Sequence, residues 1–409
     1  MIGILHLVEF QMTFLLFIAL AGYLLASRIN QSAVIGEILV GLLVGPSVLG
    51  IITYTDFVSG LAHLGAVFLL FVVGMEFRLE DIAKPRYFLI AAAGVAVPWG
   101  VGFLTSTLFG YQFGSSLFIG TSLTATSIAI TAKVLKEMGK LKTEVGRAII
   151  GAAVIDDVLG LLVLAVVNGV VAGSLSLVSL ALVFGKAVLF LGLGALVGHF
   201  GFRKLLLAVD KTAFTCRYPE VTFLFATMLA FLYGMTAELL GLSAIVGAFI
   251  AGASLGGVKL VHGKDLHQGS DFLQIIFASI FFVSLGILAD VRALDLRVVV
   301  FLIVLTVAAI VSKLIGCGGV ARLAGNSIRD SAIIGFGMSP RGEVAMIIAL
   351  IGLDKGLIDQ GVYVTIILMS LLTTIATPLV LRRLLVRKED EGSRRAQLSR
   401  KTRKVITRS

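Results

Sequence analysis

The chain has 409 residues, of which 58% are hydrophobic and only 14% are charged. A soluble domain carries about 25% charged residues, and this chain has too little polar surface to cover its core in water, which excludes a soluble globular protein. The net charge of +10 is not a nucleic-acid signal, because the basic residues lie in short loops and at the C-terminus. We find no enzyme or cofactor motif, and we expect no enzymatic activity, cofactor or nucleic-acid partner.

Apolar segments long enough to cross a bilayer recur from Val8 to Leu381. A span needs about 20 apolar residues to cross a hydrocarbon core of roughly 30 Å. The sequence therefore predicts an all-α polytopic membrane protein with about 13 transmembrane helices. In chain order they lie at residues 8–26, 33–52, 57–77, 87–109, 114–136, 145–169, 177–202, 220–238, 241–257, 271–289, 296–321, 330–353 and 361–382.

Lys and Arg residues are strongly biased to one side of these spans. The side that holds the basic C-terminal tail also holds most other basic residues, including Lys140 and Arg203. The opposite side holds only Arg292, Arg297 and Lys355. The positive-inside rule then predicts a cytoplasmic C-terminus and, with an odd number of spans, an N-terminus outside.

The sequence contains a weak internal repeat. Residues 32–36 (SAVIG) resemble residues 243–247 (SAIVG). Three glycine pairs follow at matching offsets, the last after a one-residue slip: Gly41 with Gly252, Gly45 with Gly256, and Gly74 with Gly286. The repeat maps span 2 onto span 9 and, by extension, span 5 onto span 12, so the copies have opposite orientations. Inverted repeats are typical of secondary transporters, although glycine-rich membrane helices also resemble one another by chance.

Asp156 and Asp157 are the clearest candidates for a functional site, because they lie in the middle of the span at 145–169. Ionisable groups inside a membrane are costly and usually functional. Adjacent residues point about 100° apart on a helix, so the two carboxylates should have different roles. A buried carboxylate binds a proton or a metal cation through the same oxygens, and this competition is the chemistry of antiport. The alternative is a structural pair satisfied by hydrogen bonds.

Two lysines also lie inside predicted spans. Lys313 is central in the span at 296–321, and an unpaired ammonium there would need an acidic partner or would lose its proton. Asp156 or Asp157 is the expected partner, and snorkelling to the interface is the alternative. Lys186 has no motif around it, so snorkelling or lipid contact explains it as well as function does.

The span at 330–353 contains the sequence GFGMSPRGE at residues 335–343. Gly, Pro and two charges inside an apolar run predict an interrupted helix, and a simple proline kink is the alternative. Arg341 and Glu343 would offset the dipole ends of its two half-helices. The repeat places residues 124–127 (TATS) opposite this stretch, so a second break is inferred there from symmetry alone. Unwound carbonyls and Thr hydroxyls are hard oxygen ligands suited to Na⁺ or K⁺.

Together these motifs resemble the cation:proton antiporter-2 family, in its Kef/NapA branch of bacterial antiporters. The resemblance covers about residues 8–382 and rests on residues 36–46 (GEILVGLLVGP), 124–127, 153–158 (AVIDDV), Lys313 and 340–345 (PRGEVA). It implies an NhaA/NapA-like antiporter fold, in which two discontinuous helices cross inside a core domain beside a dimerisation domain. It also implies a homodimer in a bacterial or archaeal cytoplasmic membrane, with an elevator-like movement of the core.

The resemblance further implies roles for individual residues. Asp157 would bind the cation and the proton, Asp156 would pair with Lys313, and Thr126 would lie near the cation. Asp157, Asp156 and Thr126 would thus be the ligands of Na⁺ or K⁺. The remaining residues of the crossing would support it: Thr124, Ser127, Ser339, Pro340, Arg341 and Glu343.

We expect one transmembrane antiporter domain at residues 1–382 and a basic cytoplasmic tail at 383–409. By resemblance, the domain divides into a core at about 57–169 and 271–382 and a dimerisation scaffold at about 8–52 and 177–257. The tail is too short for the nucleotide-binding domain that Kef-type members often carry.

The expected function is exchange of Na⁺ for H⁺, with Li⁺ or K⁺ as alternative cations. The aspartate pair and Lys313 resemble sodium/proton members, and Kef-type K⁺/H⁺ exchange is the alternative. A cation channel could share oxygen-lined sites, but the inverted repeat and the buried charges favour a carrier. Adjacent aspartates cannot face each other, which argues against an intramembrane aspartyl protease. A symporter of organic anions would be expected to lack the aspartate pair and the buried lysine.

Overall fold

The computed structural model describes residues 7–77, 84–173, 177–212, 220–258, 263–289 and 296–406, with a few single residues between these ranges. Side chains at 263–265, 343 and 386–406 lie outside this description. The regular elements of the described residues are all helical: α2 (Val8–Arg28), α3 (Ala33–Val44), α4 (Asp56–Met75), α6 (Pro85–Leu108), α7 (Phe113–Thr124), α8 (Ile128–Glu137), α9 (Glu144–Val171), α10 (Leu177–Leu196), the π-helix η1 (Val197–Phe202), α11 (Arg203–Asp210), α13 (Glu220–Leu239), α14 (Ala244–Leu255), α15 (Gly263–Leu288), α16 (Leu296–Lys313), the π-helix η2 (Leu314–Gly318), α17 (Gly319–Leu323), α18 (Ile328–Gly337), α19 (Glu343–Asp354) and α20 (Gln360–Ile406).

The number of helices that can span a membrane is lower than the sequence predicts. Among the described residues, ten helical segments are long and apolar enough, counting α7 and α8 together. The other three predicted spans contain shorter helices, such as α3 and α14 with 12 residues each. A helix of that length rises about 18 Å, which is less than the hydrocarbon thickness. The prediction of thirteen transmembrane helices is therefore not confirmed, whereas the all-helical multi-pass architecture is.

Helices α3 and α15 cross closely through glycines. A Cβ built on Gly41 of α3 would overlap the carbonyl of Val283 in α15, and a Cβ on Gly286 of α15 would overlap the carbonyl of Ile38 in α3. No side chain fits at either position, so the two backbones make direct contact. Close approach of this kind is typical of membrane helices with small residues at the contact.

Helices α14 and α4 repeat the same arrangement. A Cβ on Gly252 of α14 would overlap the carbonyl of Phe71 in α4, and a Cβ on Gly74 of α4 would overlap the carbonyl of Phe249 in α14. These glycines are the ones that the sequence repeat aligns with Gly41 and Gly286. The repeat is therefore visible in the packing, and each copy contributes one helix to each crossing.

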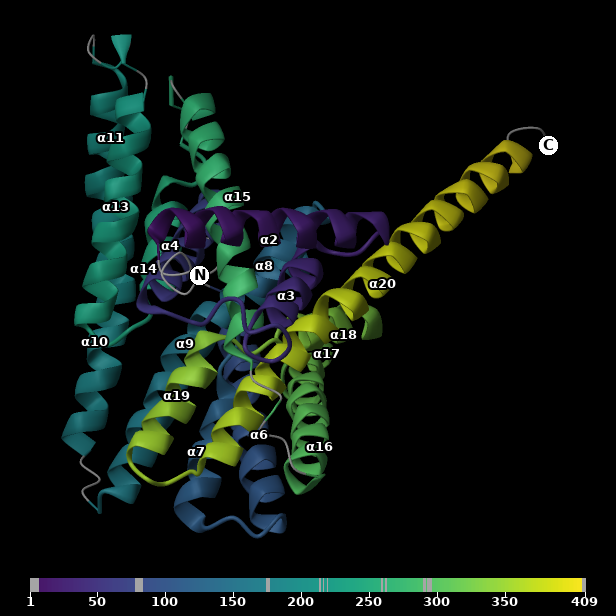
Figure 1. Ribbon diagram of the computed structural model, residues 1–409. Coiled ribbons are helices and arrows are strands. Elements are labelled where there is room, and N and C mark those ends of the chain that lie inside the picture. The colour runs from purple at the N-terminus through teal and green to yellow at the C-terminus, as the bar shows by residue number, and fades with distance from the viewer. Residues whose placement is uncertain are drawn as a thin grey trace.

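Helices α6, α7, α9, α16 and α18 to α20 form a second group beside these crossings, whereas α2 packs on α3 and α13 packs on α14. Helix α6 packs against α7, α9 and α16, while α20 packs against α16, α18 and α19. Helices α10, α11 and α13 run along one edge of the bundle, and α20 continues away from it toward the C-terminus (Figure 1). Tyr233 of α13 donates a hydrogen bond of 2.8 Å to the carbonyl of Gly194 in α10, which ties that edge together.

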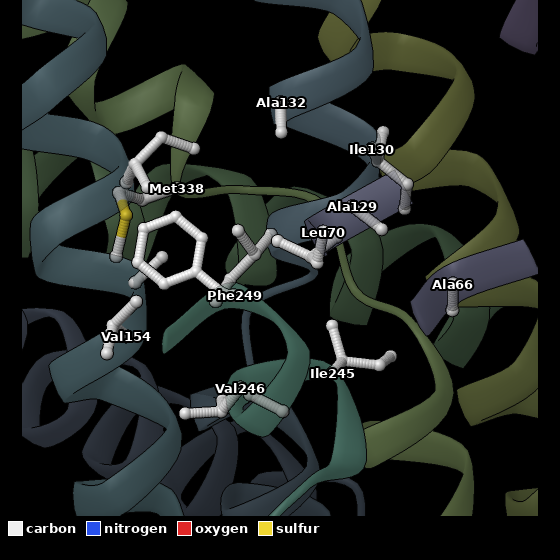
Figure 2. Close-up of a cluster of buried hydrophobic side chains, with 14 of the residues drawn as sticks. Ala66, Leu70, Ala129, Ile130, Ala132, Val154, Ile245, Val246, Phe249 and Met338 are labelled. Atoms are coloured by element: carbon white, nitrogen blue, oxygen red, sulfur yellow. The ribbon is translucent and has the colours of Figure 1, made fainter. Parts of the chain in front are cut away.

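An apolar layer separates α4 and α14 from the broken helices. In Figure 2, side chains of α4 and α14 face side chains of α8 and α9 and the residue that follows α18. The labelled members are Ala66, Leu70, Ala129, Ile130, Ala132, Val154, Ile245, Val246, Phe249 and Met338. All are buried, and none carries a polar side chain. The contact across this apolar layer therefore depends on shape and apolar burial rather than on directional bonds.

Candidate functional site

Two interrupted helices meet near the centre of the bundle. Helix α7 ends at Thr124 and α8 begins at Ile128, while α18 ends at Gly337 and α19 begins at Glu343. Both breaks that the sequence and the repeat predict are therefore present.

Hydrogen bonds join the two breaks directly. The backbone N–H of Ser127 donates to the carbonyl of Pro340 at 2.8 Å. The hydroxyl of Thr126 donates to the carbonyl of Met338 at 3.2 Å. Backbone groups that the breaks leave without helical partners are thus satisfied across the crossing, as a low-dielectric interior requires.

The two breaks have different origins. Pro340 has no N–H to donate, so the second helix must lose a hydrogen bond at this point. Ala125 to Ser127 contain no such residue. Their break is stabilised by the bond from Ser127 to Pro340, a contact distant in sequence. Local propensity therefore explains the second break, whereas tertiary contact explains the first.

Arg341 closes the crossing with a fully buried guanidinium group. It donates to the carbonyls of Met338 and Ser339, at 3.3 and 2.7 Å, and to the carbonyl of Ala309 in α16, at 3.1 Å. Met338 and Ser339 follow the C-terminus of α18, where a helix carries partial negative charge. Arg341 therefore compensates this end of α18 and links the crossing to α16.

Sequence reasoning missed several hydroxyl side chains that support the crossing. Thr131 of α8 donates to the carbonyl of Gly337 at 2.6 Å. Thr373 of α20 accepts from the backbone N–H of Arg341 at 3.2 Å, and Thr374 donates to its carbonyl at 3.0 Å. The available signal was a pair of adjacent threonines inside an apolar span, where each hydroxyl needs a partner.

The two aspartates lie on α9 beside this crossing. Asp156 is fully buried, and its Oδ1 lies 2.9 Å from Nζ of Lys313, which is also fully buried. Thr126 interacts with the Asp156 carboxylate as well. Asp157 is 9% exposed. The pairing that the resemblance implies is therefore present, while the ion-binding and proton-binding roles of these residues stay a prediction.

Lys313 lies at a distinctive position in its helix. It is the last residue of α16 before the π-helix η2, and π-helical turns are frequent at functional sites. A Cβ on Gly94 of α6 would overlap Sγ of Cys317 and lie 3.5 Å from Nζ of Lys313 and 3.6 Å from Oδ1 of Asp156. The ion pair is thus enclosed by α6, α9 and η2.

The other predicted site residues are less central. Thr124 and Ser339 donate hydrogen bonds of 2.7 and 2.8 Å within their own helical turns, to the carbonyls of Thr121 and Gly335. The side chain of Glu343 lies outside the described residues. The arrangement therefore brings Asp156, Lys313 and Thr126 together with both breaks, and Asp157 follows one residue later on the same helix.

Comparison with known proteins agrees with this arrangement. The family profile described as "Sodium/hydrogen exchanger, transmembrane" matches residues 15–387. The Na(+)/H(+)-K(+) antiporter GerN of Bacillus cereus is 34% identical over 360 residues, which cover 88% of this chain and 91% of that protein. The high-affinity Na(+)/H(+) antiporter NhaS3 of Synechocystis sp. is 31% identical over 401 residues, covering 87% and 85%.

Solved structures show the same fold. The sodium proton antiporter MjNhaP1 from Methanocaldococcus jannaschii at pH 8 superposes with a TM-score of 0.65 at 16% identity, covering 91% of this chain and 94% of that one. The family profile is broader than the cation:proton antiporter-2 branch that the motifs resemble, and it does not single out that branch. Because the family profile and the relatives both match most of its length, the chain belongs to the sodium/hydrogen exchanger family.

Proposed function

We propose that this protein exchanges Na⁺ for H⁺ across the cytoplasmic membrane, with Li⁺ or K⁺ as further cations. The observation that carries the proposal is the buried Asp156–Lys313 pair beside two crossed helix breaks, with Asp157 next to it. The names of the relatives support Na⁺, because GerN is called a Na(+)/H(+)-K(+) antiporter and NhaS3 a Na(+)/H(+) antiporter. They do not favour the Kef-type alternative.

Asp157 is the proposed exchange carboxylate. Lys313 neutralises Asp156, so Asp157 carries the negative charge that attracts a cation to the crossing. The hydroxyl of Thr126 and carbonyls of the breaks supply further oxygen ligands. Arrival of a proton on Asp157 removes its charge and releases Na⁺, and arrival of Na⁺ displaces the proton. If Na⁺ also engages Asp156, Lys313 gives up its proton, and the exchange becomes electrogenic.

The proposed mechanism moves a core against a scaffold. Helices α4 and α15 pack against each other. In addition, α4 packs against α14, and α15 packs against α3. We therefore assign α4 and α15 to the scaffold. This differs from the domain boundary expected from the sequence, which placed residues 57–77 and 271–289 in the core. The apolar layer of Figure 2 then lies between the two parts.

We also propose that the protein forms a homodimer through the scaffold. Within the described structure, α10 buries only Ala187 and Phe190. The rest of its apolar surface is available to lipid or to a second copy. The N-terminus is placed outside and the C-terminus in the cytoplasm, as the distribution of Lys and Arg favours.

The test uses everted membrane vesicles from a host without its own antiporters. Na⁺, Li⁺ and K⁺ are added in turn to vesicles with a preformed proton gradient. We expect Na⁺ to collapse the gradient with the wild-type chain and not with Asp157→Asn. Asp354→Asn, an exposed position at the end of α19, is the matched control and should behave as wild type. If no cation collapses the gradient, or if Asp157→Asn retains exchange, the proposal is wrong.

A further inference from the structure

The inner end of α8 carries a polar face that the exchange site does not use. Lys136 and Glu137 lie three and four residues after Lys133, which places both on the same side of the helix as Lys133. This end of α8 lies beside Lys140, on the side predicted to be cytoplasmic. It is also the half-helix that begins directly after Thr126 and Ser127.

Two members of this face are bonded to scaffold helices. Ser32, the residue before α3, donates a hydrogen bond of 2.6 Å to Oε2 of Glu137. Nζ of Lys136 lies 2.7 Å from Oδ1 of Asp271 and 2.6 Å from Oε1 of Gln274, both in α15. Charge-assisted bonds of this length are directional and hold a defined geometry.

A third scaffold group, Glu37 of α3, lies within electrostatic range of Lys133. Glu37 is 1% exposed, interacts electrostatically with Lys133 and is hydrogen-bonded to Ser279 of α15. Among the described residues, its Oε2 has no hydrogen-bond partner. A carboxylate buried inside a membrane protein needs a functional or structural reason, and the exchange site supplies none for Glu37.

Two other contacts between the broken helices and the scaffold are apolar on the side of the broken helices. Closer to the crossing, Ala129, Ile130 and Ala132 of α8 pack in the apolar layer of Figure 2. Helix α19, the counterpart of α8 in the repeat, faces the scaffold across a cavity of about 340 Å³. Its side of that cavity is lined by Met346, Ile347 and Leu350.

A second cavity of about 450 Å³ adjoins the polar face and reaches Ser32 and Glu137. Water in this cavity can solvate the two side chains once they separate. The polar bonds can thus be exchanged for bonds to water at this end of α8. An apolar contact, by contrast, slides without losing directional bonds.

We propose that Lys133, Lys136 and Glu137 of α8, together with Glu37, Ser32, Asp271 and Gln274 of the scaffold, form a latch that holds the inner half-helix in this conformation. The latch separates each time the core moves, and it re-forms when the core returns. This inference rests on the proposed exchange function, because it assigns a task in the transport cycle to residues outside the ion site.

A reversible cross-link tests the latch. In Ser32→Cys/Glu137→Cys, oxidation joins α8 to the scaffold, and peptide mass spectrometry identifies the bond. Na⁺-dependent proton movement is measured in vesicles before oxidation, after oxidation and after reduction. We expect at least a tenfold loss on oxidation and recovery on reduction. A fully cross-linked protein that exchanges at the reduced rate would overturn the latch.

A cross-link within the scaffold is the matched control. Ser47 donates a hydrogen bond of 2.5 Å to the carbonyl of Ala289, so Ser47→Cys/Ala289→Cys joins the end of α3 to the end of α15. Because both helices belong to the scaffold, oxidation should leave exchange unchanged. Equal loss in both cross-linked proteins would contradict a latch located at α8.

Charge reversal gives a measurement that does not depend on cysteines. We expect Lys136→Asp to change the apparent KM for Na⁺ by threefold or more, and Lys136→Asp/Asp271→Lys to return it toward the wild-type value. A single reversal without effect would contradict the latch. If the wild-type chain exchanges no cation, both the proposed function and the latch are wrong. If the reduced double-cysteine chain is active and its cross-link has no effect, only the latch is wrong.

Discussion

Lys313 and Asp156 form an ion pair in which neither side chain has exposed surface, with 2.9 Å between Nζ and Oδ1. The pair joins the end of α16 to α9. Asp156 also interacts with Thr126, which lies in the break between α7 and α8. The pair therefore has a structural role in addition to any role in exchange, and the two roles can be separated by experiment.

Removing one partner of this pair should destabilise the protein more than removing both. Lys313→Gln leaves a buried carboxylate without its cation, and breaking a buried pair in this way costs about 3–5 kcal/mol. Asp156→Asn/Lys313→Gln leaves no uncompensated charge, so it should lose less stability than Lys313→Gln alone, and therefore less than the sum of the two single variants. Thermal unfolding in detergent measures the three values. Strictly additive losses would mean that the pair is not coupled.

Gly94→Ala should impair the ion pair through crowding. The new methyl group would overlap Sγ of Cys317 and contact Nζ of Lys313, and overpacking typically costs about 1–3 kcal/mol. Adding Cys317→Ala removes the overlapping sulfur, so the double variant should recover stability and exchange.

Gly100→Ala, on the same helix, is the control for this experiment. Within the described structure, no atom outside the adjoining turns of α6 lies within 4 Å of a Cβ built at Gly100. We therefore expect Gly100→Ala to leave both the melting temperature and the exchange rate unchanged. If Cys317→Ala fails to rescue Gly94→Ala, crowding at the pair is not the cause of the defect.

Arg341→Gln should destabilise the crossing. The guanidinium group bonds three buried carbonyls, and each buried polar group left without a partner costs about 1–3 kcal/mol. Arg322→Gln is the comparison, because Arg322 is exposed and donates to the carbonyl of Asn326. We expect a large drop in melting temperature for Arg341→Gln alone. Similar behaviour of the two variants would show that the buried bonds contribute little.

Proton competition should appear in the pH dependence of exchange. If Na⁺ and H⁺ bind the same Asp157 carboxylate, lowering the pH raises the proton occupancy, and more Na⁺ is needed to displace the proton. The apparent KM for Na⁺ should rise as pH falls, by up to about tenfold per pH unit. Initial rates over a range of Na⁺ concentrations at several pH values measure this. A KM that does not change with pH would mean that the two ions bind different groups.

The sequence predicted the second helix break better than the first, for a physical reason. Pro340 and the glycines around it disfavour a helix locally. The break at Ala125 to Ser127 depends on the bond from Ser127 to the carbonyl of Pro340, which no local pattern encodes. The internal repeat alone predicted this break, because it relates residues 124–127 to the break that Pro340 causes in the other copy.

The count of thirteen spans is not confirmed by helix length, because hydropathy does not report where a helix ends. Residues 33–52 are apolar apart from Glu37 and Ser47, but α3 stops at Val44, just before Gly45 and Pro46. The residue before a proline disfavours helical geometry, so this signal was present in the sequence. Likewise, Gly256 and Gly257 follow α14, and Gly257 has a φ of +73°, which ends the helix.

The glycine crossings have a consequence for how the chain is assembled. Helix α3 comes from the first half of the sequence and packs on α15 from the second, while α14 from the second half packs on α4 from the first. The halves are interlocked, and neither contains both members of a crossing. During synthesis the glycine faces of α3 and α4 can therefore gain their native partners only after α15 and α14 have been made. A chain divided after α9 would need both pieces in the same membrane to assemble.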